Sequence, residues 1–443
     1  MSVELDEIKI PVEDLEIGMY VSRLDRPWTE TDFLLQGFLI ESPETIDSLR
    51  AQCDFVYIET KSQFLHPSRA RFERRSEKHG LFARKKQNAR STSRSSESGA
   101  SKTDKASQKA RKKTSYINKV PIETEFPEAK KSYGYAKLTA KNIMDGIRIG
   151  RTIDMNESRL VVNRVVDSII RNSNALVWLT KLKNKDEYTA EHSLNVCILS
   201  AAFARHLGLD EDEIRKIGLC GLLHDVGKAK IPLEVLNKPG RFTDEEFEIM
   251  KMHPLYGRDL LMSLSDSDTA AIDVAYNHHE RIDEMGYPRG LKSHQIPYYS
   301  RIIAITDTYD AITSSRCYDQ GRSSMDALDI IYKNKGRQFD EELAIEFIKC
   351  IGIYPPGSIV EMSNGEVGII IASNQESKLR PKIIMVLDAD KKKQREKIVN
   401  LRDLPKDDSG NPYAIKAEIP NGKYGVRIQD FIKRGLVLEP ANQ

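Results

Sequence analysis

Hydrophobic and polar residues alternate in three different ways along the 443-residue chain. Residues 7 to 65 hold short apolar runs such as KIPVEDL and FVYIET between turn residues, which predicts a small β-rich module with one helix at about Pro43–Gln52. A helical period dominates from about residue 143 to residue 350. From about residue 355, the runs GSIVEM and GEVGIIIA flank Asn364-Gly365, a dipeptide typical of β-hairpins. We therefore expect a multidomain protein, with an all-α block between a small β-rich N-terminal module and a small β-rich C-terminal appendage.

Two helix starts are marked inside the helical block. Asp210 and Glu213 have capping-box spacing and follow Gly208, a residue that commonly ends the preceding helix. Thr243 and Glu246 repeat the same pattern. With these signals we divide the chain into a module at residues 1–66, a linker at 67–120, a helical region at 135–352 with its core at about 180–350, and an appendage at 353–443.

The linker carries most of the positive charge. Residues 69 to 113 contain 16 Lys and Arg against 4 Asp and Glu, a local net charge of +12, although the whole chain has a net charge of +2 and the remainder is therefore at −10. The segment is rich in serine and almost free of large apolar residues, so it cannot bury enough surface to offset the entropy of ordering. We expect a disordered tether that could touch an anionic membrane surface, nucleic acid or an acidic partner. Without interleaved aromatic residues or a folded basic face, the pattern disfavours specific nucleic-acid binding.

Composition indicates an ordinary soluble protein with 40% hydrophobic and 30% charged residues. No apolar run approaches the roughly 18 residues of a membrane span, and the N-terminus MSVELDEIKI does not resemble a signal peptide, so we expect a cytoplasmic location and no transmembrane segment. The five cysteines have no CxxC spacing, which favours reduced thiols over a zinc ribbon or a disulfide framework.

Candidate chemistry begins where an apolar helical stretch, residues 218 to 223, runs into His224-Asp225-Val226-Gly227-Lys228. A buried carboxylate beside a histidine requires a partner, and a metal ion would supply one. On a helix the two adjacent side chains would point about 100° apart. A carboxylate of Asp225 that bridges two ions, with His224 on one of them, would satisfy that geometry.

The peptide HHERIDEMGYP, residues 278 to 288, leads to the same conclusion. Neighbouring imidazoles diverge, and two metals a few ångströms apart would accept one each. A single histidine is more often an ordinary core or surface residue, so the combination carries the hypothesis. The candidate metal ligands, which include five of the seven histidines of the helical block, are His192, His224, Asp225, His253, His278, His279 and Asp307.

These segments resemble a known family. HDVGK at 224–228 resembles the HD superfamily of metal-dependent phosphohydrolases, and HHERIDEMGYP resembles the signature of its HD-GYP branch. The resemblance extends over about residues 180–350, through HSLNV, LNKPGRFTDEE, HPLYG, IPYYSRIIAITDTYDAITSSRCY and QFDEELAIEF. The N-terminal runs LEIGMYVSRLDRPW and FLLQGFLIES are similar to a small domain often found before bacterial HD-GYP domains.

The resemblance implies an HD-type helical catalytic domain that acts as a bacterial cyclic di-GMP phosphodiesterase. It places the seven candidate residues on the metal ligands of the family, with Asp225 as the bridging carboxylate. Iron or manganese would be expected, although the ligand types do not exclude zinc, nickel or cobalt. A hydroxide shared by two such metals would attack the phosphodiester and yield linear pGpG or, after a second cleavage, GMP. The family also suggests docking of diguanylate cyclase domains, and the helical residues from about 143 to 182 could pack internally or form a homodimer.

Three further residues are expected to act on the substrate: Lys228, with Asp225, in catalysis and in substrate binding, and Arg316 and Tyr287 in substrate binding. Lys228, expected near His224 on a helical turn, would place positive charge at the scissile phosphate, unless it is a surface lysine at a helix end. Arg316 would hold a phosphate, unless it is simply solvated. Tyr287, in the rigid turn at 286–288, would line the nucleotide pocket or a partner surface, unless the turn only orients the two histidines.

Two departures from the family pattern bear on activity. Glu284 stands where the family usually has glycine, so a positive φ at this position would strain the loop and its charge would repel an anionic substrate. Members with a third metal use a glutamate one turn before the first histidine, where this chain has Tyr188 with Glu187 off that face, so we expect two metals. The alternatives are a catalytically weak cyclic dinucleotide receptor or scaffold that signals to a partner, and a different HD phosphohydrolase such as a nucleotidase. The Gly-Tyr-Pro turn argues against the nucleotidase.

Overall fold

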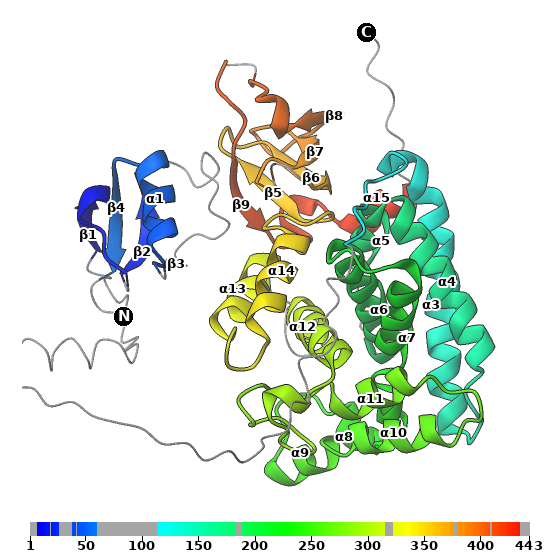
Figure 1. Cartoon of the computed structure of the whole chain (residues 1–443). Coiled ribbons are helices and arrows are strands. Elements are labelled where there is room, and N and C mark those ends of the chain that lie inside the picture. Colours follow the sequence, from blue (N-terminus) through cyan, green and yellow to red (C-terminus); the bar gives the residue numbers. More distant parts are fainter. Residues whose placement is uncertain are drawn as a thin grey trace, which may run out of the picture. The chain divides into compact units, whose positions relative to one another are not determined.

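The computed structural model describes residues 7–17, 19–25, 38–40, 42–59, 113–182, 188–314, 322–374, 377, 379–407 and 410–434. The chain forms two compact units, Met1–Lys112 and Lys113–Gln443 (Figure 1). Within the described ranges, no helix combines the length and the apolar character needed to cross a bilayer.

The N-terminal unit is an antiparallel sheet with one helix. Its strands are β1 (Glu7–Pro11), β2 (Tyr20–Leu24), β3 (Phe38–Leu39) and β4 (Phe55–Glu59), in the order β1-β4-β2-β3, with the 3₁₀ turn η1 at Val12–Asp14. Helix α1 spans Pro43–Gln52, with proline in its first turn, and confirms the helix predicted there. Val21, Leu49 and Val56 are fully buried between the helix and the sheet.

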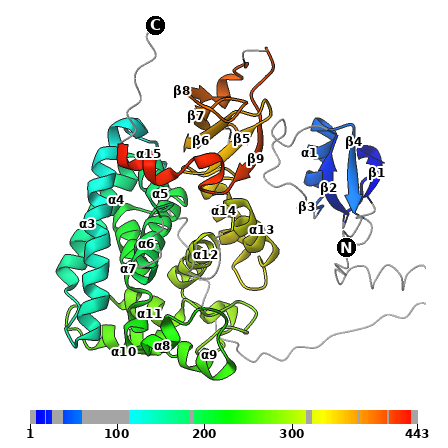
Figure 2. The same cartoon turned by 180° about the vertical axis from the view of Figure 1, so that it is seen from behind.

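Helices make up most of the second unit. They are α3 (Ile122–Arg148), α4 (Met155–Arg171), α5 (Ser173–Leu179), α6 (Tyr188–His206), α7 (Glu211–Leu223), α8 (Leu233–Leu236), α9 (Asp244–Met250), α10 (His253–Met262), α11 (Thr269–Asn277), α12 (Tyr298–Thr313), α13 (Ser324–Lys333) and α14 (Glu341–Ile351), with the 3₁₀ turns η4 (Val226–Lys230) and η5 (Ser293–Gln295). The long helices α3 and α4 run side by side along one face of this bundle (Figures 1 and 2). Helix α6 packs against α7 and α12, and this central group carries much of the candidate site.

Helical structure begins earlier than the hydrophobic pattern predicts. Helix α3 starts at Ile122, whereas the pattern places the first helical residues at about 143 and the helical region at 135. Its buried face includes Ala129, Ala136 and Ala140, whose small side chains repeat at helical spacing but add little hydrophobicity. A period search that weighs large apolar residues therefore misses this helix.

The end of the predicted linker is attached to the helices. The amide of Thr114 donates a hydrogen bond to the Gly208 carbonyl at 2.9 Å, and the amide of Lys119 donates to the Arg171 carbonyl at 2.8 Å. Residues 113–120 are therefore part of the second unit, contrary to the predicted linker end at 120. The remainder of that linker, residues 67–112, lies outside the described residues.

Both predicted helix starts are present. The Asp210 side chain accepts a hydrogen bond from the Glu213 amide at the start of α7, and Gly208 before it has φ of +77°. Thr243 and Glu246 form a complete reciprocal capping box at the start of α9. Each start therefore satisfies amide groups that the first helical turn leaves without a partner.

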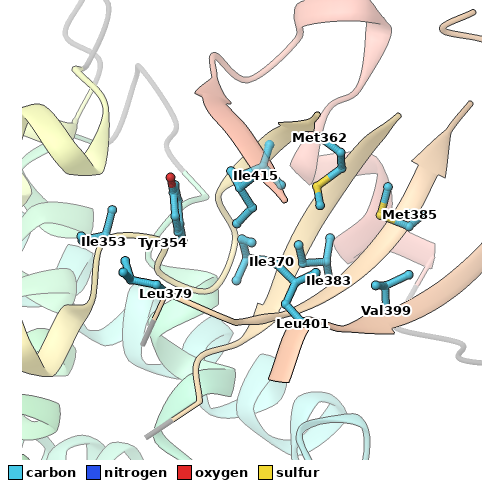
Figure 3. Close-up of a cluster of buried hydrophobic side chains, with 11 residues drawn as sticks. Ile353, Tyr354, Met362, Ile370, Leu379, Ile383, Met385, Val399, Leu401 and Ile415 are labelled. Carbon is cyan, nitrogen blue, oxygen red and sulfur yellow. The ribbon is translucent and has the colours of Figure 1, made fainter. Parts of the chain in front are cut away.

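The C-terminal part is a five-stranded antiparallel sheet. The strands β5 (Ile359–Met362), β6 (Val367–Ala372), β7 (Lys382–Leu387), β8 (Lys393–Asn400) and β9 (Ile415–Ile419) lie in the order β8-β7-β6-β5-β9, with the short elements η6 (Leu401–Asp403), η7 (Lys423–Gly425) and α15 (Ile428–Arg434). Strands β5 and β6 pair across the Asn364-Gly365 turn, where Gly365 has φ of +88°, so the predicted hairpin is confirmed. A buried cluster that includes Met362, Ile370 and Ile383 fills one side of the sheet (Figure 3).

Candidate metal centre

The seven predicted ligands come together from five helices and the residues that follow them. His192 lies in α6, His224 and Asp225 follow α7, His253 begins α10, His278 and His279 follow α11, and Asp307 lies in α12. All are buried except His279, which is half-buried. The structure therefore gathers residues that are up to 115 positions apart in sequence, from 192 to 307.

Glycines permit the close approach of these helices. A Cβ atom on Gly221 would lie 2.9 Å from the Cα and amide nitrogen of Cys197, so glycine lets α7 press against α6. A Cβ atom on Gly227 would lie 1.9 Å from the His253 carbonyl oxygen and 2.5 Å from the Gly257 nitrogen. The glycine of the HDVGK peptide thus seats α10, and with it His253, against the turn that carries Asp225.

The HDVGK peptide is not one continuous α-helix. Helix α7 ends at Leu223, Asp225 has φ of −105° and ψ of 10°, and residues Val226–Lys230 form a 3₁₀ turn. The expected 100° separation of adjacent helical side chains therefore does not apply. Lys228 lies in this 3₁₀ turn, and its Nζ donates to Oδ2 of Asp225, the oxygen that is 3.2 Å from Nε2 of His224.

The hydrogen bonds at Nδ1 fix how three of the imidazoles are oriented. Nδ1 of His224 contacts the Gly221 carbonyl at 2.8 Å, and Nδ1 of His253 contacts the Met250 carbonyl at 2.7 Å. Nδ1 of His278 contacts the carbonyl of Ala275 at 3.1 Å. A carbonyl only accepts, so Nδ1 donates in each ring, and in the neutral imidazole Nε2 is left with a lone pair.

Those lone pairs face one another in the centre of the cluster. Nε2 of His253 lies 3.3 Å from Nε2 of His278. Two neutral imidazoles that both donate through Nδ1 present two acceptors at this contact, which is repulsive unless a cation lies beside them. Nε2 of His224 and Oδ1 of Asp225 are buried and have no hydrogen-bond partner among the described residues, which is the condition of atoms that await a metal.

The protonation states also suit metal ligation. Burial lowers the pKa of His253 to about 4 and lowers the pKa of His279 well below its ordinary value, so both rings are neutral at pH 7. Burial alone would raise the pKa of Asp225, but the neighbouring His224 and Lys228 outweigh it and hold the carboxyl ionised. Burial would likewise raise the pKa of Asp307, but the hydrogen bond with His192 outweighs it and lowers the pKa of this carboxyl.

The ligand atoms fall into two groups that share Asp225. One group contains Asp225, His253, His278 and His279, and the other contains His192, His224 and Asp225, with the atoms of each group within 4.8 Å of one another. Oδ1 of Asp307 lies 2.9 Å from Nε2 of His192 and 3.9 Å from Nε2 of His224, so it adjoins the second group. Imidazole and carboxylate donors of this kind suit divalent metal ions.

His278 and His279 are placed in the same group, whereas the sequence pattern assigned them to separate metals. His278 is the C-cap of α11, so the chain leaves the helix before His279 and the two rings do not diverge by a helical step. Their ring centroids are 4.2 Å apart, and both rings lie close to that of His253.

A cavity of about 340 Å³ lies against this cluster. His278, His279 and Asp307 form its metal-centre side, and Met285, Gly286 and Tyr287 form another wall. Lys251 and Arg281 add positive charge, while Phe247 and Phe339 add aromatic surface. A ligand in the cavity would thus contact the histidine and aspartate cluster, the side chains of Lys251 and Arg281, and several aromatic rings.

Comparison with known proteins decides the family. The family described as an HD domain matches residues 166–343. A cyclic di-GMP phosphodiesterase of Pseudomonas aeruginosa is 33% identical over 383 residues, which cover 86% of this chain and 85% of that protein. The chain belongs to the HD-GYP family of phosphodiesterases.

Other matches cover smaller parts of this HD-GYP protein. The cyclic di-GMP phosphodiesterase response regulator RpfG of Xanthomonas campestris is 44% identical over 141 residues, or 31% of this chain and 36% of that protein. The 3'3'-cGAMP-specific phosphodiesterase 1 of Vibrio cholerae is 35% identical over 157 residues, or 35% and 36% of the two chains. Residues 7–158 match a domain of unknown function, and residues 359–407 match a KOW domain associated with the HD domain.

The HD-GYP signature forms a loop that folds back onto the metal centre. The Tyr287 amide donates to the His279 carbonyl at 3.2 Å, and the two rings stack with centroids 4.6 Å apart. The Glu280 carboxylate accepts hydrogen bonds from the amides of Arg289 at 2.7 Å and Leu291 at 2.9 Å, which fixes the far side of the loop. Tyr287 thus both covers a candidate ligand and lines the cavity.

Gly286 and Glu284 are unusual positions of this loop for different physical reasons. Gly286 is not in the left-handed region; a Cβ atom there would lie 2.4 Å from the Arg281 nitrogen and 2.6 Å from Cα of Glu280, so close approach requires the glycine. Glu284 does have a positive φ, of +64°, the condition under which a residue that replaces glycine is strained. Its side chain is exposed. The strained residue of this HD-GYP loop is therefore Glu284.

Sequence reasoning missed Asp310, which is 1% exposed and holds His192. Oδ2 of Asp310 lies 2.8 Å from Nδ1 of His192, and its Oδ1 accepts from Asn195 at 3.1 Å. Asp307 and Asp310 are three positions apart on α12, as are His192 and Asn195 on α6. Residues at this spacing share a helix face, so the sequence could have indicated that Asp310 lies beside the predicted ligands.

Three residues considered from the sequence cannot be placed. Arg316 and Glu187 lie outside the described residues, as does the side chain of Tyr188. Their expected relations to the phosphate and to a third metal stay predictions.

Proposed function

We propose that this HD-GYP protein hydrolyses cyclic di-GMP to linear pGpG, with further hydrolysis to GMP as a slower second reaction. In this proposal the seven clustered residues hold two divalent metal ions, iron or manganese. The observation that carries it is the pair of donor groups sharing Asp225, with unprotonated imidazole nitrogens facing one another beside a cavity of about 340 Å³.

The two oxygens of Asp225 face different donor groups, which supports a bridging role. Oδ1 lies 3.3 Å from Nε2 of His253 and 3.6 Å from Nε2 of His278. Oδ2 lies 3.2 Å from Nε2 of His224 and 3.6 Å from Nε2 of His192. When bound, two metals would supply a nucleophile from water at neutral pH and would neutralise phosphate oxygens.

Lys228 and the cavity cations would bind the phosphates. Lys228 is 20% exposed in its side chain and donates to Asp225, so a phosphate bound at the metals would meet its ammonium group beside this carboxylate. Lys251 and Arg281 line the cavity, where they would attract the second phosphate of a cyclic dinucleotide. Arg316 remains a further candidate from the sequence pattern.

Tyr287 would contact a purine base. Its ring lies between His279 and Phe247, with centroid distances of 4.6 and 6.2 Å, so it offers an aromatic surface at the cavity wall. Base stacking on such a surface favours a purine without distinguishing guanine from adenine. The choice of cyclic di-GMP over 3'3'-cGAMP therefore rests on the Pseudomonas relative, which matches most of the chain.

A turnover assay tests the proposal. The full chain would be reconstituted anaerobically with Fe²⁺ or Mn²⁺ and incubated separately with cyclic di-GMP, 3'3'-cGAMP and cyclic di-AMP, and the products would be resolved by chromatography. We expect pGpG to form before GMP. Asp225→Ala should lose both bound metal and turnover, whereas Asp259→Ala, on the exposed side of α10, should retain both.

The same assay separates the enzyme from a receptor. The alternative of a weakly active receptor draws support from the exposed charge and strained backbone of Glu284. Nucleotide binding without turnover by the metal-loaded chain, with every metal tried, would contradict the proposed reaction and favour the receptor. Docking of diguanylate cyclase domains and homodimer formation stay predictions from the sequence.

A further inference from the structure

A second cavity, of about 300 Å³, lies at the opposite end of α6 from His192. It is enclosed by residues 114–118, the start of α5, the end of α6, the end of α14 and the residue after β6. Arg205 lies thirteen positions after His192 on the same helix, a rise of about 20 Å, so this cavity is distinct from the metal centre. Among the described residues that line it, none is an aspartate or glutamate.

Arg205 is the unusual residue of this cavity. It is only 5% exposed. Its Nη2 donates to Oδ1 of Asn118 at 3.1 Å, and its guanidinium carbon lies 5.5 Å from the ring centroid of Tyr116. Within the described part of the chain, Nε of Arg205 has no hydrogen-bond partner and the guanidinium forms no ion pair with a carboxylate. A neutral amide and an aromatic ring are thus its main protein contacts.

Such an arrangement leaves a buried charge uncompensated. Buried guanidinium groups in folded proteins are normally paired, because removal of a charge from water is costly and a neutral partner recovers only part of that cost. Burial lowers the pKa of Arg205, opposed only by Cys350 and Tyr116, in agreement with the lack of an acidic neighbour. If Arg205 served only to hold Asn118, an uncharged donor could do so without the cost of burying a charge.

We infer that this cavity binds a small phosphate-bearing anion, with the Arg205 guanidinium as its anchor. Guanidinium groups bind phosphate oxygens through paired N–H donors, and Nε supplies a donor that no protein group uses among the described residues. The hydroxyl groups of Ser115 and Ser173 also line the cavity and can donate further hydrogen bonds, while the Ser373 hydroxyl donates to Oδ1 of Asn174 at 3.2 Å. A volume of about 300 Å³ is at the lower end of ligand pockets, which fits inorganic phosphate or a small phosphate monoester better than a cyclic dinucleotide.

The ligand would also affect the segment that closes the cavity. Residues 113–120 are fixed by the Thr114 amide on the Gly208 carbonyl and by the Tyr116 hydroxyl on the Leu209 carbonyl, which is 2.9 Å away. Tyr116 and Asn118 both contact Arg205. An anion on Arg205 would therefore hold this segment more firmly and slow hydrogen exchange of the Thr114 amide.

Calorimetry on the full-length chain tests the inference. The chain would first be stripped of metal with chelator, so that phosphate cannot bind through metal ions, and then titrated with inorganic phosphate, GMP and guanosine. We expect one phosphate site per chain and no binding of guanosine. GMP binding as tightly as phosphate would identify a phosphate monoester as the ligand, and phosphate alone would identify free phosphate.

Two variants and a control locate the site. Arg205→Gln should weaken phosphate binding at least about tenfold, because a charge-assisted hydrogen bond is lost. Ser373→Phe, which fills the cavity but keeps Arg205 and its protein contacts, should abolish binding even if Arg205→Gln disturbs folding. Arg215→Gln, on the surface of α7 where Arg215 pairs with Asp167, should leave binding unchanged.

Two results would overturn the inference. One is the absence of phosphate binding by the metal-free wild-type chain at millimolar concentrations. The other is equal phosphate affinity in the wild type and in Ser373→Phe, because the anion would then bind elsewhere. Exchange at the Thr114 amide should slow with phosphate in the wild type and in Arg215→Gln, but not in Ser373→Phe.

Discussion

Substitution of Asp310 by asparagine should weaken metal binding without removing any metal ligand. Asp310 is buried, and its Oδ2 accepts a hydrogen bond from the Ser314 hydroxyl at 3.1 Å. Two nitrogen donors also bind the carboxylate, Nδ1 of His192 at 2.8 Å and Nδ2 of Asn195 at 3.1 Å. The carboxamide of the Asp310→Asn variant would have nearly the same shape as the carboxylate but only one oxygen. Whichever way it is oriented, one of these two donors would face an NH₂ group.

The size of the effect follows from that conflict. If the NH₂ group faces His192, the ring must move its proton to Nε2, which then cannot bind a metal. If the oxygen faces His192, the hydrogen bond loses its charge, and the Asn195 side chain must turn so that its oxygen, which has no partner among the described residues, accepts from the new NH₂ group. Loss of such an outer partner typically reduces metal affinity or activity by about 10- to 100-fold. The buried donor conflict should also lower the free energy of unfolding by about 1–3 kcal/mol.

Competition with a chromophoric chelator would measure the affinity for Mn²⁺, and urea unfolding of the metal-free chain would measure stability. Asn195→Ala, which removes one donor but keeps the Asp310 charge, should reduce metal affinity much less than Asp310→Asn. Asp259→Asn, an exposed exchange on α10, should change neither quantity. An Mn²⁺ affinity of Asp310→Asn within a factor of two of the wild type would refute the idea that Asp310 selects the tautomer of His192.

Three more predictions test other parts of the site. Gly227→Ala should lower the free energy of unfolding by about 1–3 kcal/mol, measured in urea, and should reduce the metal content, because a Cβ atom would lie 1.9 Å from the His253 carbonyl oxygen. The control Gly134→Ala, on α3 where a Cβ atom would meet nothing within 4 Å, should instead stabilise the chain. Glu284→Gly should relieve the backbone strain of the positive φ, and the loss of the exposed charge should lower the KM for cyclic di-GMP about two- to fivefold at low salt. Glu284→Gln should lower the KM by a similar factor but keep the backbone strain. A KM that is unchanged in both variants would contradict the role of the charge. Burial lowers the pKa of His253 from 6.5 to about 4, so as the pH falls the imidazole is protonated in the unfolded chain at a higher pH than in the folded chain. His253 should therefore contribute a loss of up to about 3 kcal/mol of stability in the metal-free chain between pH 6.5 and pH 4, in addition to the loss from His279, whose pKa is lowered as well. A His253→Gln variant whose stability falls as much as that of the wild type would contradict this assignment.

Much of the candidate site could be predicted from the sequence because its residue types are costly in a protein interior. Histidines and carboxylates at the ends of apolar helices, such as His224 and Asp225, indicate a metal even before their neighbours are known. Helix starts were predictable for a similar reason, since the side chains of Asp210 and Thr243 satisfy local amides. Both kinds of signal are contained within a few residues of sequence.

Other features depend on segments that are distant in sequence and could not be predicted in this way. Gly221 and Gly227 are required because Cys197 and His253 come close to them, and nothing near either glycine in sequence reveals that contact. The hydrogen bond between His192 and Asp310 requires that α6 and α12 be adjacent. The early start of α3 was missed because alanine contributes to helix packing without a strong hydrophobic pattern.

One local rule explains the orientation of three of the imidazoles, and it depends only on the position of each histidine relative to the end of the preceding helix. His224, His253 and His278 each direct Nδ1 at the carbonyl three residues earlier, of Gly221, Met250 and Ala275, and each of these carbonyls lies in the last turn of a helix. The last carbonyls of a helix have no partner within the helix, so a histidine just beyond the helix end can take one as its acceptor. That hydrogen bond selects the tautomer with a free Nε2 and turns this nitrogen away from the helix. The ends of α7, α9 and α11 therefore both satisfy their own backbones and present lone pairs to one centre, which explains why a helical scaffold can build such a site from single histidines.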